Sequence, residues 1–162
     1  MAISYDFEMA ASLPALQVAE RLLRAARTAG LLDASATPEE LLEQGLRTTR
    51  GTSVQVFEEH PEPWNPVVGD LGFTPTLSVT FRLGKSTGFP AQQDDIVVLV
   101  DALLATVTGD AVLEFQSEDI WLLRRGGDLT LNERDDLWPP QRLALLNQPH
   151  RRATYTFTDD GV

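Results

Sequence analysis

The chain contains no cysteine and only two histidines among its 162 residues. The lack of cysteine excludes a disulfide framework, a thiol nucleophile and a thiolate metal site, and it is compatible with a reducing compartment. His60 and His150 do not fall into a zinc-ligand spacing such as HExxH, so we expect two loop histidines on the surface. Asp6 and Glu8 stand where a signal peptide would need a basic start and an apolar run. We therefore expect a cytoplasmic protein.

Long apolar runs and basic patches are also missing. The most apolar stretch, Ile96 to Val107, is interrupted by Asp101 and is shorter than the about 20 residues that a membrane-spanning helix needs. The arginines occur as scattered pairs or as one helical stripe, whereas a nucleic-acid binder normally shows a basic patch. We expect neither a membrane nor nucleic acid as a partner.

Acidic residues, by contrast, are abundant: 24 Asp and Glu face 13 Lys and Arg, which gives a net charge of -11. The excess is concentrated in residues 58–119, which hold 11 acids and 2 bases, while residues 120–162 hold 6 of each. A local negative field attracts cationic partners and repels polyanions. The sequence thus predicts a protein that binds a basic surface.

The hydrophobic pattern predicts alternating strands and helices. Apolar and polar residues alternate with the period of a half-buried strand in several segments, and other segments show the 3.6-residue period of a helix. The expected strands are 2–9, 52–58, 73–83, 110–116 and 119–125, and the expected helices are 12–30, 38–46 and 92–108. A Gly126-Gly127 hairpin turn, a short helix from Trp138 to Leu146 and a late strand or tail over 152–158 complete the pattern.

Residues near the helix starts suggest how the helices are capped. Ser12 is a candidate N-cap for the first helix, and Thr37 followed by Pro38 is a candidate for the second. We expect Asp94 and Asp95 to lie in the first turn of the long apolar helix, where negative charge is favourable.

The element order favours the α+β class, with an antiparallel sheet and helices on one face. We expect a split-βαβ, ferredoxin-like core over residues 1–116, followed by a C-terminal hairpin and short helix over 117–162, in a single domain of residues 1–162. The length of the chain suits one domain with a sizeable core.

No residue set in the sequence points to catalysis or to a cofactor. Gly84-Lys85 resembles the end of a phosphate loop, but Val79 stands where that motif needs its first glycine. Adjacent acids could supply oxygen ligands to a divalent cation, although neighbours on a strand point to opposite faces. The acid pairs in question are Glu58/Glu59, Asp94/Asp95, Glu118/Asp119 and Asp135/Asp136. We expect no enzyme, and keep a small metal-dependent enzyme or a small-molecule regulatory module as alternatives.

A binding surface is the better use of these acids. Carboxylates on a rigid fold speed association with a basic partner, and Trp64 in a proline-rich acidic loop is a candidate anchor, since interface hot spots favour tryptophan. Packing of Trp64 onto the core is an equally open alternative. Trp121 and Trp138 are expected in the core or at its rim. The predicted contact residues are Glu58, Glu59, Glu62, Trp64, Asp70, Glu118 and Asp119.

Three segments carry a family resemblance. The opening Ile3-Ser-Tyr-Asp-Phe-Glu8, the later Trp121-Leu-Leu-Arg-Arg-Gly-Gly-Asp-Leu-Thr-Leu-Asn132 and the nearby Trp138 resemble bacterial polymorphic-toxin immunity proteins of the swarming-inhibition type. The resemblance implies a small cytoplasmic protein that neutralises a cognate toxin domain. It supplies no site residues, because no binding motif is defined to match.

Overall fold

A single mixed sheet organises the computed structural model, which describes residues 3–85 and 87–158. The described strands form one eight-stranded sheet in the order β2-β3-β4-β1-β5-β6-β7-β8, antiparallel throughout except for the parallel pair β7 and β8. The expected α+β class is confirmed. The strands are β1 (Ser4–Met9), β2 (Leu46–Arg47), β3 (Ser53–Glu58), β4 (Leu77–Arg82), β5 (Ala111–Phe115), β6 (Asp119–Arg125), β7 (Asp128–Leu131) and β8 (Arg151–Arg152). The helices are α1 (Ala15–Thr28), α2 (Pro38–Glu43), α3 (Phe89–Thr106) and α4 (Pro140–Leu143), with a π-helical turn η1 (Val67–Leu71).

Strand β1 lies in the middle of the sheet, where its backbone pairs with a neighbouring strand on both sides. Its side chains alternate between a buried face and a polar face. It pairs with β4 on one edge and with β5 on the other, so that Asp6 lies between Thr80 and Glu114. Tyr5, Phe7 and Met9 are buried on one face. The alternation seen in the sequence predicted this strand correctly.

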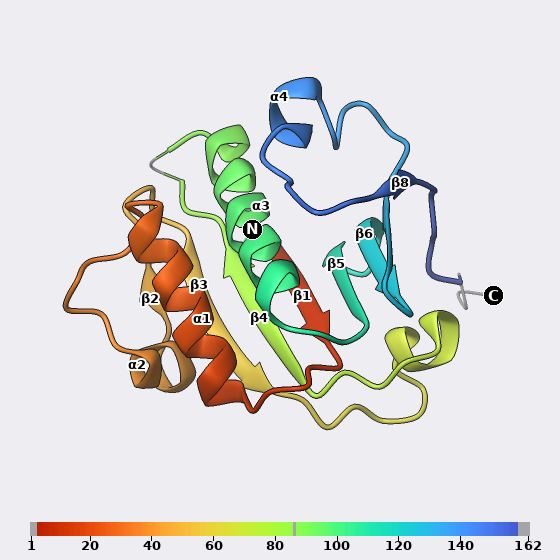
Figure 1. The fold of residues 1–162 in the computed structure, drawn as a ribbon, viewed down its shortest axis with the longest axis horizontal. Coiled ribbons are helices and arrows are strands. Elements are labelled where there is room, and N and C mark those ends of the chain that lie inside the picture. Colours follow the sequence, from red (N-terminus) through yellow and green to blue (C-terminus); the bar gives the residue numbers. More distant parts are fainter. Residues whose placement is uncertain (1–2, 86, 159–162) are drawn as a thin grey trace.

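Helices α1 and α3 lie side by side across that face of the sheet (Figure 1). Phe7, Leu22 and Leu103 have no exposed surface, so side chains fill the space between the sheet and the helices. No helix of the described ranges, α3 included, has the length and hydropathy needed to cross a membrane.

The helix ends confirm one cap prediction and correct two details. Thr37 and Glu40 form a reciprocal capping box at the start of α2, as its sequence predicted. Ser12 does not cap α1: the helix begins after an extended Pro14, and the Ser12 hydroxyl instead accepts a hydrogen bond from Thr108. Helix α3 begins at Phe89, so it has no acidic residue in its first turn and the placement of Asp94 and Asp95 there was wrong.

The passage from α3 into β5 is fixed by two residues. The guanidinium of Arg124 on β6 donates to the carbonyl oxygens of Leu104, Val107 and Gly109, which satisfies the end of the helix. Gly109 has φ +128°, and a Cβ there would collide with the Ala10 carbonyl oxygen. Only glycine therefore fits this close approach of the loop to the end of β1.

The second face of the sheet is divided into two parts. Segment 67–73, which includes η1, covers β5 and β6 and forms a small apolar cluster of its own with Val112, Ile120 and Leu123. Over β3, β4 and β1 the same face carries mainly polar side chains. This polar half is the part of the second face that segment 67–73 leaves uncovered.

Candidate functional site

The structure separates the predicted contact residues into two places. Glu58 at the end of β3 is opposite Leu77, which is opposite Met9 at the end of β1. Asp119 is opposite Phe115, which is opposite Tyr5 near the start of β1. Segment 58–70, which follows β3 along the bottom of Figure 1, thus lies at one end of the sheet. It contains Glu58, Glu59, Glu62, Trp64 and Asp70. Glu118 and Asp119 lie at the other end.

Trp64 is the most exposed large hydrophobic side chain among the described residues, with 79% of its surface accessible. The alternative that it packs onto the core is therefore wrong. Trp121 and Trp138 are 3% and 1% exposed, which confirms their prediction as core residues. Near Trp64 in the sequence, Glu58 and Glu62 are exposed and Glu59 is half-buried, so the loop presents both an aromatic side chain and carboxylates to solvent.

Two of the predicted contact carboxylates already have partners within the chain. Asp70 Oδ2 accepts a hydrogen bond of 2.8 Å from the Thr158 amide, and Asp119 Oδ1 lies 3.1 Å from Arg134 Nη1. Glu118 is exposed in the β5–β6 turn. Each end of the sheet thus has one predicted contact carboxylate that is already engaged within the chain, Asp70 at one end and Asp119 at the other.

The strand register aligns further polar residues in rows across the uncovered half of the sheet. One row of cross-strand partners runs from β3 through β4 and β1 to β5 and consists of Phe57, Ser78, Glu8 and Val112. The next row is Gln55, Thr80, Asp6 and Glu114. Directly opposite residues on a sheet face have neighbouring side chains, so Asp6, Glu8 and Glu114 come together although Glu114 is about a hundred positions away in sequence.

Glu114 is 4% exposed and sits at the boundary with the apolar cluster under η1. Burial, the nearby Asp6 charge and a hydrogen bond with the Asp6 carboxyl raise the pKa of Glu114 to about 7, while hydrogen bonds from Ser117 act in the opposite direction. Ser117 belongs to the β5–β6 turn and has a left-handed φ of +60°, as does its neighbour Gln116 at +49°. Both backbone conformations are unfavourable for residues with a Cβ, and they bring the serine to the buried carboxyl.

Glu8, a half-buried residue, is the second acid of this group with a raised pKa. Its Oε2 atom is buried and has no hydrogen-bond partner. Burial, followed by repulsion from Glu114, Asp6 and Glu59, raises the pKa of Glu8 to about 8. Glu59 of the loop therefore acts on Glu8, which links the acidic loop to the sheet face.

No cation within the described residues neutralises this group. The ion pairs of residues 3–85 and 87–158 involve other acids, and the donor to Asp6 Oδ1 is the neutral Thr80 hydroxyl at 2.7 Å. Throughout the same ranges, no three His, Asp or Glu side chains are arranged to hold a metal ion. The two histidines are exposed, as expected. Asp6, Glu8 and Glu114, hereafter the carboxylate cluster, thus face mainly each other.

A shallow depression adjoins the carboxylate cluster on the same face. Its volume is about 390 Å³, and it lies over β2, β3 and β4 with Gln55, Phe57, Thr80 and Arg82 among its lining residues. Phe57 is 41% exposed, and its aromatic ring is available at the rim. The depression, the carboxylate cluster and the acidic loop make up one candidate interface.

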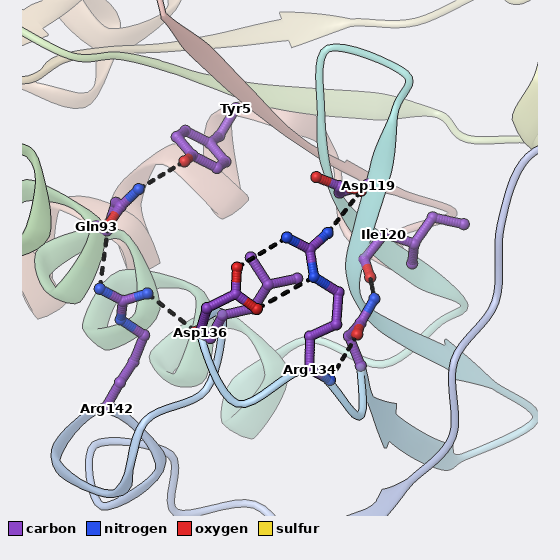
Figure 2. A network of polar contacts seen from close by, with 9 residues as sticks. Tyr5, Gln93, Asp119, Ile120, Arg134, Asp136 and Arg142 are labelled. Carbon is purple, nitrogen blue, oxygen red and sulfur yellow. Dashed lines mark hydrogen bonds and ion pairs between the residues drawn. The ribbon is translucent and has the colours of Figure 1, made fainter.

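The opposite side of the sheet carries a polar network of a different kind, which attaches the C-terminal region (Figure 2). Arg142, 4% exposed, lies 2.7 Å from Asp94 and donates to Gln93 and to the Leu137 carbonyl oxygen. Gln93 donates in turn to the Tyr5 hydroxyl, as Figure 2 shows. Every charged group of this network has a partner, so the network serves to hold α4 and the segment before it against α3.

The sequence predicted a strand over residues 2–9, which contains Asp6 and Glu8, but it assigned neither these two acids nor Glu114 to a site. The alternation that places Asp6 and Glu8 on one face is visible in the sequence. What was not visible is that β5 pairs with β1, because this pairing depends on the topology of the whole sheet.

Comparison with known proteins identifies a family. Searches of curated proteins and of solved structures give no match. Residues 3–142 match the SitI3-like family, and the match extends from β1, with Asp6 and Glu8, to Arg142 in α4. The chain therefore belongs to the SitI3-like family.

Proposed function

We propose that this protein is an immunity protein, which binds and neutralises a cognate bacterial toxin domain. The family match over residues 3–142 carries the proposal, since SitI names denote swarming-inhibition immunity proteins. Such a protein acts by binding and has no need of catalytic residues or a cofactor. It would act in the cytoplasm of the cell that it protects.

The acidic surface supports this function by its chemistry. Trp64 is a large aromatic side chain in solvent, flanked by Glu58, Glu59 and Glu62. An exposed aromatic anchor surrounded by charge is typical of a partner-binding surface, and the charge favours a basic toxin domain. Asp70, Glu118 and Asp119 belong to the proposed surface as outlying charges.

The alternatives receive less support from the structure. A regulatory module would hold its ligand between the sheet and the helices, and that space is filled by side chains such as Phe7 and Leu103. A metal-dependent enzyme would need converging ligands, which the described residues do not provide.

Co-expression tests the proposed function. The probe is the C-terminal domain of a large toxin encoded directly upstream of this chain. We expect this domain to arrest growth when expressed alone, growth to return when the present chain is co-expressed, and the two to co-purify as a complex. Growth arrest that persists despite soluble expression of this chain would refute the proposal.

Association kinetics test the proposed surface. We expect the charge reversals Glu58→Lys, Glu59→Lys and Glu62→Lys together to slow association by about tenfold or more and to reduce its dependence on salt. The matched control reverses three exposed acids on the helix side of the molecule, Glu20 of α1 and Glu39 and Glu43 of α2. Equal association rates for both variants would remove this surface from consideration.

A further inference from the structure

We propose that the uncovered half of the sheet is the docking face for the partner, and that a basic side chain of the partner, arginine or lysine, binds between Asp6, Glu8 and Glu114. This inference rests on the proposed function and specifies its contact surface. It moves the centre of the interface from the loop around Trp64 to the middle strand of the sheet.

The geometry of the sheet face supports this placement. Helices α1 and α3 cover one face, and segment 67–73 covers the β5–β6 part of the other. Between this segment and the short β2 edge, the face carries the carboxylate cluster and the depression of about 390 Å³. Phe57 at the rim and Trp64 in the adjoining loop are both exposed, so aromatic side chains flank the acids.

The state of the carboxylates indicates the chemistry of the occupant. Glu8 Oε2 is buried without a hydrogen-bond partner, and Glu114 is almost completely buried. A buried polar atom without a partner costs free energy, and a donor placed against it recovers that cost. A guanidinium or ammonium group supplies both the missing donors and the missing positive charge.

The charged groups that act on Glu8 are all acidic. Glu8 faces Asp6 on its own strand, Glu114 on β5 and Glu59 in the loop, and its β4 neighbour Ser78 is neutral. The basic group on this face of β4 is Arg82, which is opposite Ser4 and one row beyond Asp6. Arg82 makes no ion pair with the cluster in the described part of the chain.

Docking of a cation would change the protonation of the cluster. In the free protein the raised pKa values of Glu8 and Glu114 leave both carboxyls partly protonated near neutral pH. A positive charge lowers these values, so binding should release roughly one proton or more near pH 7. Affinity should therefore rise with pH through the range between about pH 6 and pH 8.

The test is isothermal titration calorimetry of the toxin domain into three proteins: the wild type, Glu8→Gln/Glu114→Gln, and the control Glu39→Gln/Glu43→Gln, which loses the same formal charge from α2. Titrations in two buffers of different ionisation enthalpy count the protons released. We expect the first variant to lose about 30-fold or more in affinity together with the proton release, and the control to stay within about threefold of wild type. Glutamine is close in shape to protonated glutamate, and circular dichroism of each variant verifies the fold.

The outcomes separate this inference from the function on which it rests. If wild type rescues growth and binds the toxin domain, but the cluster variant binds equally well and wild type releases no protons, the docking face is wrong and the immunity function stands. If the wild-type protein neither binds the toxin domain nor rescues growth, the docking face and the immunity function are both wrong. A titration with Ca²⁺ alone should show no binding, and tight binding abolished by the cluster variant would replace the proposal with a metal site.

Discussion

Buried and half-buried carboxylates lie on both sides of the sheet, and their partners differ between the two sides. On α3, Asp94 lies 2.7 Å from Arg142, Asp95 lies 2.6 Å from Arg50, and Asp101 accepts two hydrogen bonds from Asn147. On the uncovered face, Asp6, Glu8 and Glu114 meet the hydroxyls of Thr80 and Ser117 and each other. One group has cationic or amide donors from distant parts of the chain, and the other group lacks a cation.

The difference indicates what each group is for. A buried acid that is paired within the chain stabilises the arrangement that pairs it, as Arg142 does for α4. A buried acid surrounded by other acids lowers stability, and folding alone does not explain its presence. The carboxylate cluster is explained if a partner provides the cation.

The largest expected effect on stability concerns Arg142, which pairs with Asp94 of α3. Arg142→Ala should lower the free energy of unfolding by about 3 kcal/mol, because it leaves Asp94, Gln93 and the Leu137 carbonyl oxygen without their donor. Urea unfolding measures this loss. The control Arg134→Ala removes a half-exposed arginine whose ion pairs are screened by solvent, and it should cost much less. Equal losses of unfolding free energy for the two variants would show that the buried Arg142 network does not stabilise the fold more than a surface ion pair does.

The next largest effect on stability concerns Glu8 of the carboxylate cluster and depends on pH. The pKa of Glu8 is raised from an ordinary 4.5 to about 8, so the folded state favours the protonated carboxyl. The stability that accompanies protonation of Glu8 is fully present below pH 4.5 and is lost as pH rises through 8. Glu8→Gln cannot ionise and should be more stable than wild type by roughly 2 kcal/mol at about pH 9, with little difference at about pH 4. Thermal unfolding at both pH values measures it, and Glu39→Gln is the control. A less stable Glu8→Gln at high pH would show that the cluster does not destabilise the fold.

A smaller effect concerns the neutral donor of the cluster. Thr80→Val removes the hydroxyl that donates to Asp6 and should cost about 1 kcal/mol near neutral pH. In an Asp6→Asn background the same change should cost less, since the charge-assisted hydrogen bond is already gone. A double-mutant cycle by urea unfolding measures the coupling, and zero coupling would mean that Thr80 contributes only by packing.

The smallest effect on stability is expected at Trp64. Because the side chain is 79% exposed, Trp64→Ala should change the free energy of unfolding by less than about 0.5 kcal/mol. The same variant should weaken binding of the toxin domain by about tenfold or more if the ring is an anchor. A loss of stability without a loss of affinity would return Trp64 to a structural role.

Local patterns in the sequence predicted much of the sheet and helix content. The alternation of β1, β3 and β4 and the apolar run of α3 were sufficient to place these elements, and the Thr37 capping box was visible as a motif. Ser12 was misassigned because the helix starts only after Pro14. Such a boundary depends on where the chain leaves the sheet, which the sequence does not show.

The site was predicted less completely, for reasons of topology. Charge counting located the acidic loop, but it grouped Glu118 and Asp119 with it although the β5–β6 turn lies at the other end of the sheet. Asp94 and Asp95 were attributed to a helix start, whereas their partners Arg142 and Arg50 are far away in the sequence. The carboxylate cluster depends on the pairing of β1 with β5, which local patterns do not reveal.

The central claim is that the carboxylate cluster receives a cation from the partner. Carbon-13 NMR of the glutamate side-chain carboxyls, recorded across pH with and without the toxin domain, follows Glu8 and Glu114 directly. The structure predicts pKa values of about 8 for Glu8 and about 7 for Glu114 in the free protein. In the complex we expect both to fall by roughly two units or more, as a nearby positive charge favours ionisation. Unchanged pKa values in a complex that forms and protects cells would contradict the account.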